Sequence, residues 1–333
     1  MDRARVFGIA LVVVAAVGYG SGGLFAKPAY AAGVDWLTVM AWRFGIAVAL
    51  SWGLVAVRPS ARAALRGLSR RSILATLGLG ALLVLHSGTY YAGIETVPVS
   101  LAGLITAIYP PVVAVLALRF GRPLDGRRAW GALALTVAGM ILAVGGISAA
   151  AVPPASGLLL VVAAPLFYAC WIILAARHSG ETRHATGNQS AAPTDALATG
   201  ALLLTGTALT YWVVALALGH PVLPVDVPAA SWPPMLGVAV TAGFLAPQAF
   251  YAGAKRIGAA QAALVSTVEP LWTILAAGLL FGQLLTAVQW AGAALILTGV
   301  VLSQTRGRRA RAAASSDADE PVLPQPLVRL GED

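Results

Sequence analysis

Two stretches of the chain read as variants of one pattern. The first is LHSGTYYAGIETVPVSLAGLITAIYPP (Leu85–Pro111), and the second is LAPQAFYAGAKRIGAAQAALVSTVEPL (Leu245–Leu271). Each residue of the first stretch lies 160 positions before its counterpart in the second, and the same spacing relates Trp130 to Trp290. A weaker match relates VVAAVGYG at 13–20 to VVAAPLFYA at 161–169. The chain is therefore interpreted as two related halves.

The composition places both halves in a membrane. Hydrophobic residues make up 59% of the chain and charged residues 11%, with a mean hydropathy of +0.82. A soluble domain carries roughly 25% charged residues, so this chain cannot cover a water-facing surface. The one cysteine, Cys170, excludes a disulfide within the chain.

Apolar runs of about 20 residues, the length that spans a bilayer as a helix, occur ten times. The fold class expected is an all-α integral membrane protein with ten transmembrane helices in two inverted five-helix repeats. The repeats are expected at 6–148 and 157–304, followed by a disordered cytoplasmic tail at 305–333. The ten runs lie near 6–26, 36–57, 72–92, 99–118, 129–148, 157–176, 197–218, 235–253, 259–281 and 288–304.

The placement of basic residues predicts the orientation. If the N-terminus is cytoplasmic, every lysine and arginine except Lys27 and Arg43 falls in a cytoplasmic segment, as the positive-inside rule requires. The net charge of +9 then reflects topology in the cell membrane, and nucleic acid is excluded as a partner. Both termini are expected in the cytoplasm. We interpret the first run as a retained span, although AYAAG (29–33) leaves a cleaved signal peptide as an alternative.

An odd number of spans per half means that the second half enters the membrane in the opposite direction. Inverted repeats around a site at the bilayer midplane are a recurring plan of secondary transporters. Three stretches give the chain a clear resemblance to the EamA-type transporters of the drug/metabolite transporter superfamily: 18–50, 90–121 and 250–282. The resemblance implies a ten-helix carrier built from two EamA domains. Family members usually carry Gly-Glu at the ends of the fourth and ninth helices, whereas this chain has Gly121-Arg122 and Gly282-Gln283.

Two charged residues fall inside the expected spans. Arg43 lies in the second, and Glu269 lies in the middle of the ninth. A charge at bilayer depth costs several kcal/mol and usually faces a cavity or a partner. We expect both to line a central cavity, where Arg43 binds a substrate carboxylate or pairs with Glu269. Alternatively, Arg43 extends outward to the interface and Glu269 caps a local helix break.

Pro110 and Pro270 occupy equivalent positions in the two halves. Each lacks a backbone donor and is expected to open its helix locally or to kink it. Tyr109 stands where the second half has Glu269, so the two halves differ chemically at this point.

Further polar and aromatic residues are candidates for the transport pathway. His86 and Gln248 lie in the third and eighth spans, where a histidine could relay protons or only hydrogen-bond a neighbouring helix. Aromatic side chains could form the wall of a cavity or anchor the helices at the interface. The aromatic candidates are Tyr19, Trp42, Tyr90, Tyr168, Trp171 and Trp272, with Trp42 and Trp272 favoured because they adjoin the two charges.

The function predicted is a secondary transporter that exports small metabolites, amino acids or related amphiphilic compounds, by alternating access. Its partners would be the lipid bilayer, a small-molecule substrate and protons as a coupling ion. An uncoupled channel or facilitator is the alternative. An enzyme is not expected, because the spans carry no HExxH pair and no set of metal ligands. No cofactor and no metal are expected.

Overall fold

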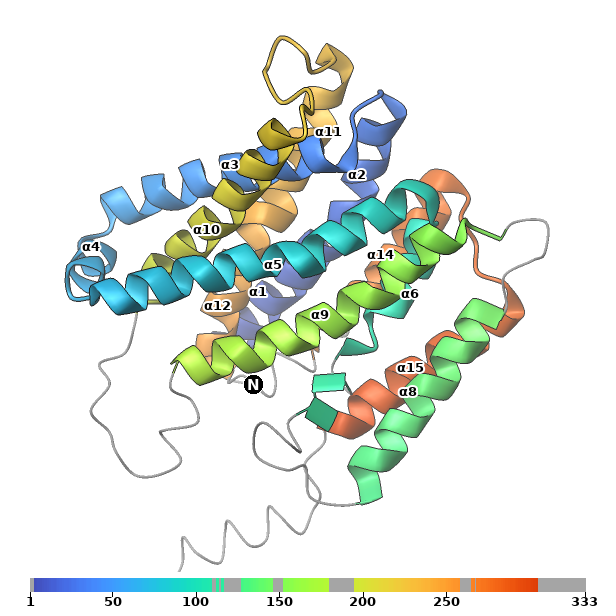
Figure 1. Cartoon of the computed structure of the whole chain (residues 1–333). Coiled ribbons are helices and arrows are strands. Elements are labelled where there is room, and N and C mark those ends of the chain that lie inside the picture. The colour runs from blue at the N-terminus through green and yellow to red at the C-terminus, as the bar shows by residue number, and fades with distance from the viewer. Residues whose placement is uncertain are drawn as a thin grey trace, which may run out of the picture.

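The computed structural model describes residues 3–109, 112–113, 115–116, 127–145, 152–179, 195–257, 265–266 and 268–304. Within these ranges the regular elements are all helical (Figure 1). The first half contains α1 (Arg3–Gly20), α2 (Gly22–Ala31), α3 (Trp36–Val57), α4 (Pro59–Arg66), α5 (Arg70–Thr96), α6 (Val99–Thr106) and α8 (Arg127–Gly145). The second half contains α9 (Ala155–Ser179), α10 (Ala196–Ala217), η3 (Ala229–Ser231), α11 (Trp232–Val238), η4 (Ala239–Leu245), α12 (Ala246–Ile257), α14 (Val268–Phe281) and α15 (Ala287–Gln304).

Six helical stretches are long and apolar enough to cross a membrane. They are Val6–Ala31, Trp36–Val57, Arg70–Thr96, Ala155–Ala175, Ala196–Ala217 and Ala229–Ala254. Three shorter apolar helices lie at Trp130–Ala143, Val268–Phe281 and Ala287–Gly299. The all-helical membrane class is therefore confirmed, whereas the number ten remains a prediction. Parts of the expected spans at 99–118 and 259–281, together with Pro110 and the tail at 305–333, lie outside the described residues.

Helices α3 and α10 begin in the same way in the two halves. Asp35 caps α3 by accepting hydrogen bonds from the backbone N–H groups of Leu37 and Thr38, at 2.9 and 3.0 Å. Asp195 caps α10 through the equivalent N–H groups of Leu197 and Ala198. An aspartate at this position satisfies donors that a helix leaves free in its first turn. Each helix then continues for 22 residues.

Glycines bring corresponding helix pairs into backbone contact in both halves. A Cβ atom on Gly93 of α5 would lie 3.0 Å from the carbonyl oxygen of Gly157 on α9. A Cβ atom on Gly253 of α12 would lie 2.8 Å from the carbonyl oxygen of Gly8 on α1. Small residues allow this close approach, which favours helix association in lipid. The pair α5–α9 therefore has α12–α1 as its counterpart.

These contacts correct the register expected for the first and sixth spans. The matching letters VVAA paired Val13 with Val161. In the structure Val161 packs on Gly93, and Val12 packs on the equivalent Gly253. Val12, not Val13, therefore holds the place of Val161, because helix contacts and not adjacent identical letters set the register.

Helices α8 and α15 lie side by side at one edge of the molecule (Figure 1). A Cβ atom on Gly139 would lie 2.6 Å from the carbonyl oxygen of Gly292, and one on Gly299 would lie 2.7 Å from that of Ala132. Gly139 is equivalent to Gly299 in the repeat, and Ala132 to Gly292. One contact thus occurs twice with the roles of the helices exchanged, as a two-fold arrangement requires.

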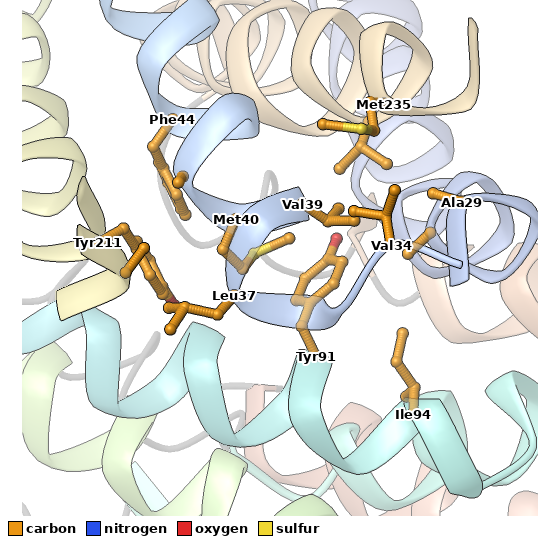
Figure 2. Close-up of a cluster of buried hydrophobic side chains, with 14 of the residues drawn as sticks. Ala29, Val34, Leu37, Val39, Met40, Phe44, Tyr91, Ile94, Tyr211 and Met235 are labelled. Atoms are coloured by element: carbon orange, nitrogen blue, oxygen red, sulfur yellow. The ribbon is translucent and has the colours of Figure 1, made fainter. Parts of the chain in front are cut away.

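The largest apolar core surrounds α3 (Figure 2). Leu37 and Met40 of α3 are 1% and 0% exposed. Tyr91 of α5 and Tyr211 of α10 reach toward them from two sides, and Met235 of α11 lies on a third side. Helix α3 is therefore held by helices from both halves of the chain.

Gly139→Ala should destabilise the protein, whereas Gly131→Ala should stabilise it slightly. The new Cβ at Gly139 meets the backbone of α15, and overpacking of this kind costs about 1–3 kcal/mol. A Cβ at Gly131, on the same helix, meets nothing within 4 Å, and alanine favours a helix by up to about 1 kcal/mol over glycine. Thermal unfolding of the two purified variants in detergent measures the difference. Equal melting temperatures would show that the contact between α8 and α15 is not tight.

Candidate functional site

Arg43 lies in the interior beside two aromatic rings. Its side chain is 8% exposed, and its guanidinium carbon lies 4.8 Å from the ring centres of both Phe44 and Tyr91. The Nη2 atom donates a long hydrogen bond of 3.4 Å to the carbonyl oxygen of Ala242. The Nε atom is buried and has no hydrogen-bond partner. A cation–π contact is worth about 0.5–2 kcal/mol, less than the several kcal/mol that burial of an ion costs. These contacts therefore compensate only part of the cost of burying Arg43, and binding of an anion would compensate more of it.

The carbonyl group that faces Arg43 belongs to an irregular helix. Segment η4 (Ala239–Leu245) is a π-helix, a form that appears frequently at functional sites. Gly243, within this segment, packs closely against α3, because a Cβ there would lie 3.1 Å from the Cβ of Ala47. The π-helix thus brings the oxygen of Ala242 within reach of the guanidinium group.

Glu269 lies at the start of a helix and not in the middle of one. Helix α14 begins at Val268, so Glu269 and Pro270 occupy its first turn. A proline in the first turn interrupts no hydrogen bond of the helix, which explains why the helix begins here. A carboxylate near a helix N-terminus gains about 0.3–1 kcal/mol from the helix dipole. The local opening of the ninth span that Pro270 predicted thus coincides with the start of α14, and Glu269 lies beside it.

Arg43 and Glu269, both among the described residues, form no ion pair with each other. The Glu269 carboxylate also has no hydrogen-bond partner in the described part of the chain. Both charges nevertheless interact electrostatically with Tyr90 and with Tyr91. Two opposite charges therefore act on the same pair of tyrosines without neutralising each other.

A group of aromatic rings extends this region. The rings of His86 and Tyr168 are stacked with centroids 4.3 Å apart, and Tyr109 meets Tyr168 edge-on at 4.9 Å. The carboxylate of Glu269 interacts electrostatically with Tyr109. His86 Nδ1 lies 3.0 Å from the carbonyl oxygen of Ala164 on α9, which fixes the orientation of the ring.

We use the term central cluster for the residues that these ring contacts and longer-range electrostatic interactions relate. Four members, His86, Tyr90, Tyr109 and Glu269, are half-buried. The central cluster consists of Arg43, His86, Tyr90, Tyr91, Tyr109, Tyr168 and Glu269.

Trp272 binds the break between α1 and α2. Its Nε1 atom donates a hydrogen bond of 2.9 Å to the Ser21 hydroxyl, which itself donates to the carbonyl oxygen of Val17 at 2.7 Å. The hydroxyl of Thr273, the next residue, approaches the carbonyl oxygens of Gly20 and Glu269 at 3.1 and 3.0 Å. The start of α14 is thereby tied to the point where the first span is interrupted.

The remaining candidates lie in other surroundings. Trp42 packs between Trp212 and Trp232, with centroids 5.3 and 4.7 Å away, and donates to the carbonyl oxygen of Val222 at 3.0 Å. It therefore anchors the segment after α10, and its ring is not one of the two over which Arg43 lies. Gln248 is half-buried and has no contact with the central cluster among the described residues.

The last two candidates, Tyr19 and Trp171, lie on α1 and α9. Tyr19 is half-buried on the last turn of α1, beside the break at Ser21. Trp171 stacks on Tyr168 at 5.9 Å and donates to the carbonyl oxygen of Leu79. Sequence reasoning did not include Tyr91 among the candidates. Tyr91 could have been identified because it directly follows Tyr90 in the sequence.

Hydrogen bonds join several segments where α2, α3 and α5 meet. Asp35 and His220 form an ion pair at 2.9 Å. The Glu95 carboxylate accepts from the Trp36 backbone at 2.7 Å, and Lys27 donates to the Glu95 carbonyl oxygen at 3.1 Å. Partial burial raises the pKa of Asp35, but hydrogen bonds from Thr38 and His220 outweigh this effect, so the pKa lies below its ordinary value of 3.8.

Gln283 stands where family members usually carry glutamate, and its side chain forms hydrogen bonds between the two halves. Helix α14 ends at Phe281, and Gly282 adopts a φ of 66°, which turns the chain. The Oε1 atom of Gln283 then accepts from the backbone N–H of Val99 at 2.9 Å and of Ser100 at 3.5 Å. A glutamine thus caps α6, a task that an acidic residue could perform equally well. Arg122 lies outside the described residues.

Comparison with known proteins identifies the class. The sequence profile of the EamA-like transporter family matches residues 6–145 and again residues 155–305. The chain belongs to this family, and it is a multi-pass membrane protein of the drug/metabolite transporter superfamily. The superposition on a solved crystal structure covers 90% of this chain and 96% of the other chain, at 16% sequence identity and a TM-score of 0.59. The two chains therefore share a fold. No curated protein matches the chain.

Gln283→Leu should lower the stability of the protein, whereas Gln283→Glu should preserve it. Leucine offers no acceptor to the N–H groups of α6, and the loss of a cap costs about 0.5–2 kcal/mol. Thermal unfolding in detergent compares the two variants. An equal loss for both substitutions would contradict the capping role.

Asp35→Asn should destabilise the protein at neutral pH and less so at acid pH. Because the pKa of Asp35 is lowered in the folded state, its ionised form stabilises the fold above pH 3.8, and this contribution disappears as the pH falls further. We expect a loss of about 1 kcal/mol at pH 7. Unfolding of both proteins at pH 7 and pH 3 measures the difference, which should be smaller at pH 3 than at pH 7.

Proposed function

We propose that the protein is a secondary transporter that exports small zwitterionic metabolites, amino acids or related amphiphilic compounds, across the cell membrane. One observation carries the proposal. Arg43 is buried and Glu269 is half-buried, they carry opposite charges, and neither forms an ion pair within the described part of the chain. A substrate with both charges would supply the missing partner of each.

The unpaired edge of Arg43 suits a carboxylate. Its Nε atom has no partner, and Nη2 makes only the long bond to Ala242. A carboxylate could accept two parallel hydrogen bonds from this edge, the strongest form of such recognition. The rings of Tyr90, Tyr109 and Tyr168 would surround the apolar part of the substrate, and an ammonium group would lie toward Glu269.

Alternating access follows from the inverted repeats that we propose at 6–148 and 157–304. Two related bundles can exchange the conformations that open one side and then the other. Both termini would lie in the cytoplasm, and the basic segments would face it. We further propose that Glu269 exchanges a proton for the substrate, because it is the one acid of the central cluster.

Arg43→Gln should abolish saturable transport, with at least a tenfold loss of rate at subsaturating substrate. The loss of a charge-assisted hydrogen bond of about 1.5–3 kcal/mol predicts this magnitude. Purified protein in proteoliposomes is tested for counterflow with a panel of radiolabelled amino acids. Arg256→Gln is the control, because Arg256 is exposed and lies over the ring of Phe7, which is not part of the central cluster. Flux that does not saturate, or that survives in the Arg43 variant, would favour the uncoupled channel.

Glu269→Gln should separate binding from coupling. Transport with and without a pH gradient is compared in the same vesicles. Proton exchange predicts that the wild-type protein responds to the gradient and that the variant does not. If rate and pH dependence are both unchanged in the variant, proton coupling through Glu269 is wrong.

A further inference from the structure

The connection between α3 and α5 and the first two residues of α5 together carry five arginines and no acidic residue. All five side chains are exposed, and within the described part of the chain their guanidinium groups form no ion pair and no hydrogen bond. Like charges at this density repel one another unless an anion binds between them. The five residues are Arg58, Arg62, Arg66, Arg70 and Arg71.

Three of these arginines lie on or next to the short helix α4. Arg62 and Arg66 are spaced by four residues along α4, so they share one side of the helix, and Arg58 immediately precedes its first residue, Pro59. We call these three residues the arginine stripe. Helix α4 is held in place by Ala61, which is 0% exposed and packs in a cluster with Leu197 of α10. Figure 1 shows α4 at the end of the bundle, between α3 and α5.

Apolar side chains lie directly beside these charges. Val57, which precedes Arg58, is 73% exposed, and Leu74, one turn beyond Arg70 on α5, is 60% exposed. Both belong to helices long and apolar enough to cross the membrane, so in a bilayer they would lie close to the acyl chains. Cationic side chains and exposed apolar side chains therefore lie within one helical turn of each other. This spacing would let a phospholipid place its phosphate against the arginines and its acyl chains against the apolar side chains.

We propose that the arginine stripe, together with Arg70 and Arg71, binds the phosphate groups of anionic phospholipids, whose acyl chains lie against Val57 and Leu74. The adjacent apolar surface favours a lipid over free phosphate or a nucleic acid. The positive-inside rule accounts for basic residues at this end of the bundle, but it depends only on their number. It does not require them to gather on and around an anchored helix. The site involves no residue of the central cluster, so it is independent of the proposed transport.

The test measures stabilisation by defined lipids. Delipidated protein in detergent is supplemented with phosphatidylglycerol or with phosphatidylcholine, and the melting temperature and the number of bound lipids, by native mass spectrometry, are recorded. Each arginine near a membrane surface contributes about fivefold to anionic lipid binding. Replacement of Arg58, Arg62 and Arg66 by glutamine should weaken phosphatidylglycerol binding at least tenfold, while melting in phosphatidylcholine stays unchanged. If the triple variant misfolds, Arg62→Gln and Arg66→Gln are measured singly, with at least a threefold loss expected.

The control removes equal charge elsewhere. Replacement of Arg306, Arg308 and Arg309 by glutamine should weaken phosphatidylglycerol binding less than replacement of the arginine stripe does. Equal losses in the two triple variants would show that only net charge matters and would overturn the proposal. Stabilisation of the wild-type protein by glycerol phosphate or inorganic phosphate to the same extent would also overturn it, because the acyl chains would then be unnecessary. Leu74→Gln should weaken binding, whereas Leu82→Gln, on the same helix, should not.

Discussion

Close contact between helix backbones at glycine is the constraint on which the structure depends. Gly93 packs on Gly157, and Gly253 packs on Gly8, in each case near a carbonyl oxygen. Lipid provides no hydrophobic driving force between helices, so dispersion contacts over short distances must hold them together. The first of these contacts fixes α5 against α9. It thereby decides which side chains of the two helices meet in the central cluster.

The two charges of that cluster both depend on departures from regular helix. The π-helix η4 places the carbonyl oxygen of Ala242 beside Arg43, and the start of α14 places Glu269 where a helix dipole favours a carboxylate. The break at Ser21 is bound by Trp272, close to the same start of α14. Irregular backbone at membrane depth is tolerated where protein or water satisfies its polar groups. These three irregularities therefore belong to one polar region that packing alone would not produce.

Charge was a better guide to the cluster than proximity in the sequence. Arg43 and Glu269 were identified because a charge in an apolar run is costly. Trp42 and Trp272 were favoured because they adjoin these charges, yet successive residues of a helix point in directions about 100° apart. Trp42 consequently faces Trp212 and Trp232, while Arg43 faces Tyr91. The sequence of a helix does not show which other helices pack against each of its sides.

The sequence by itself determined the membrane class, the family, the repeat and the two charges inside the spans, because each of these depends on composition or on similarity between residues. The tertiary structure decided that Arg43 and Glu269 form no ion pair with each other. It also decided that both charges interact electrostatically with Tyr90 and Tyr91. Finally, it decided that Gln283 caps α6 across the two halves. These relations join residues far apart in the chain, and they exist only once the glycine contacts have set the distances between helices.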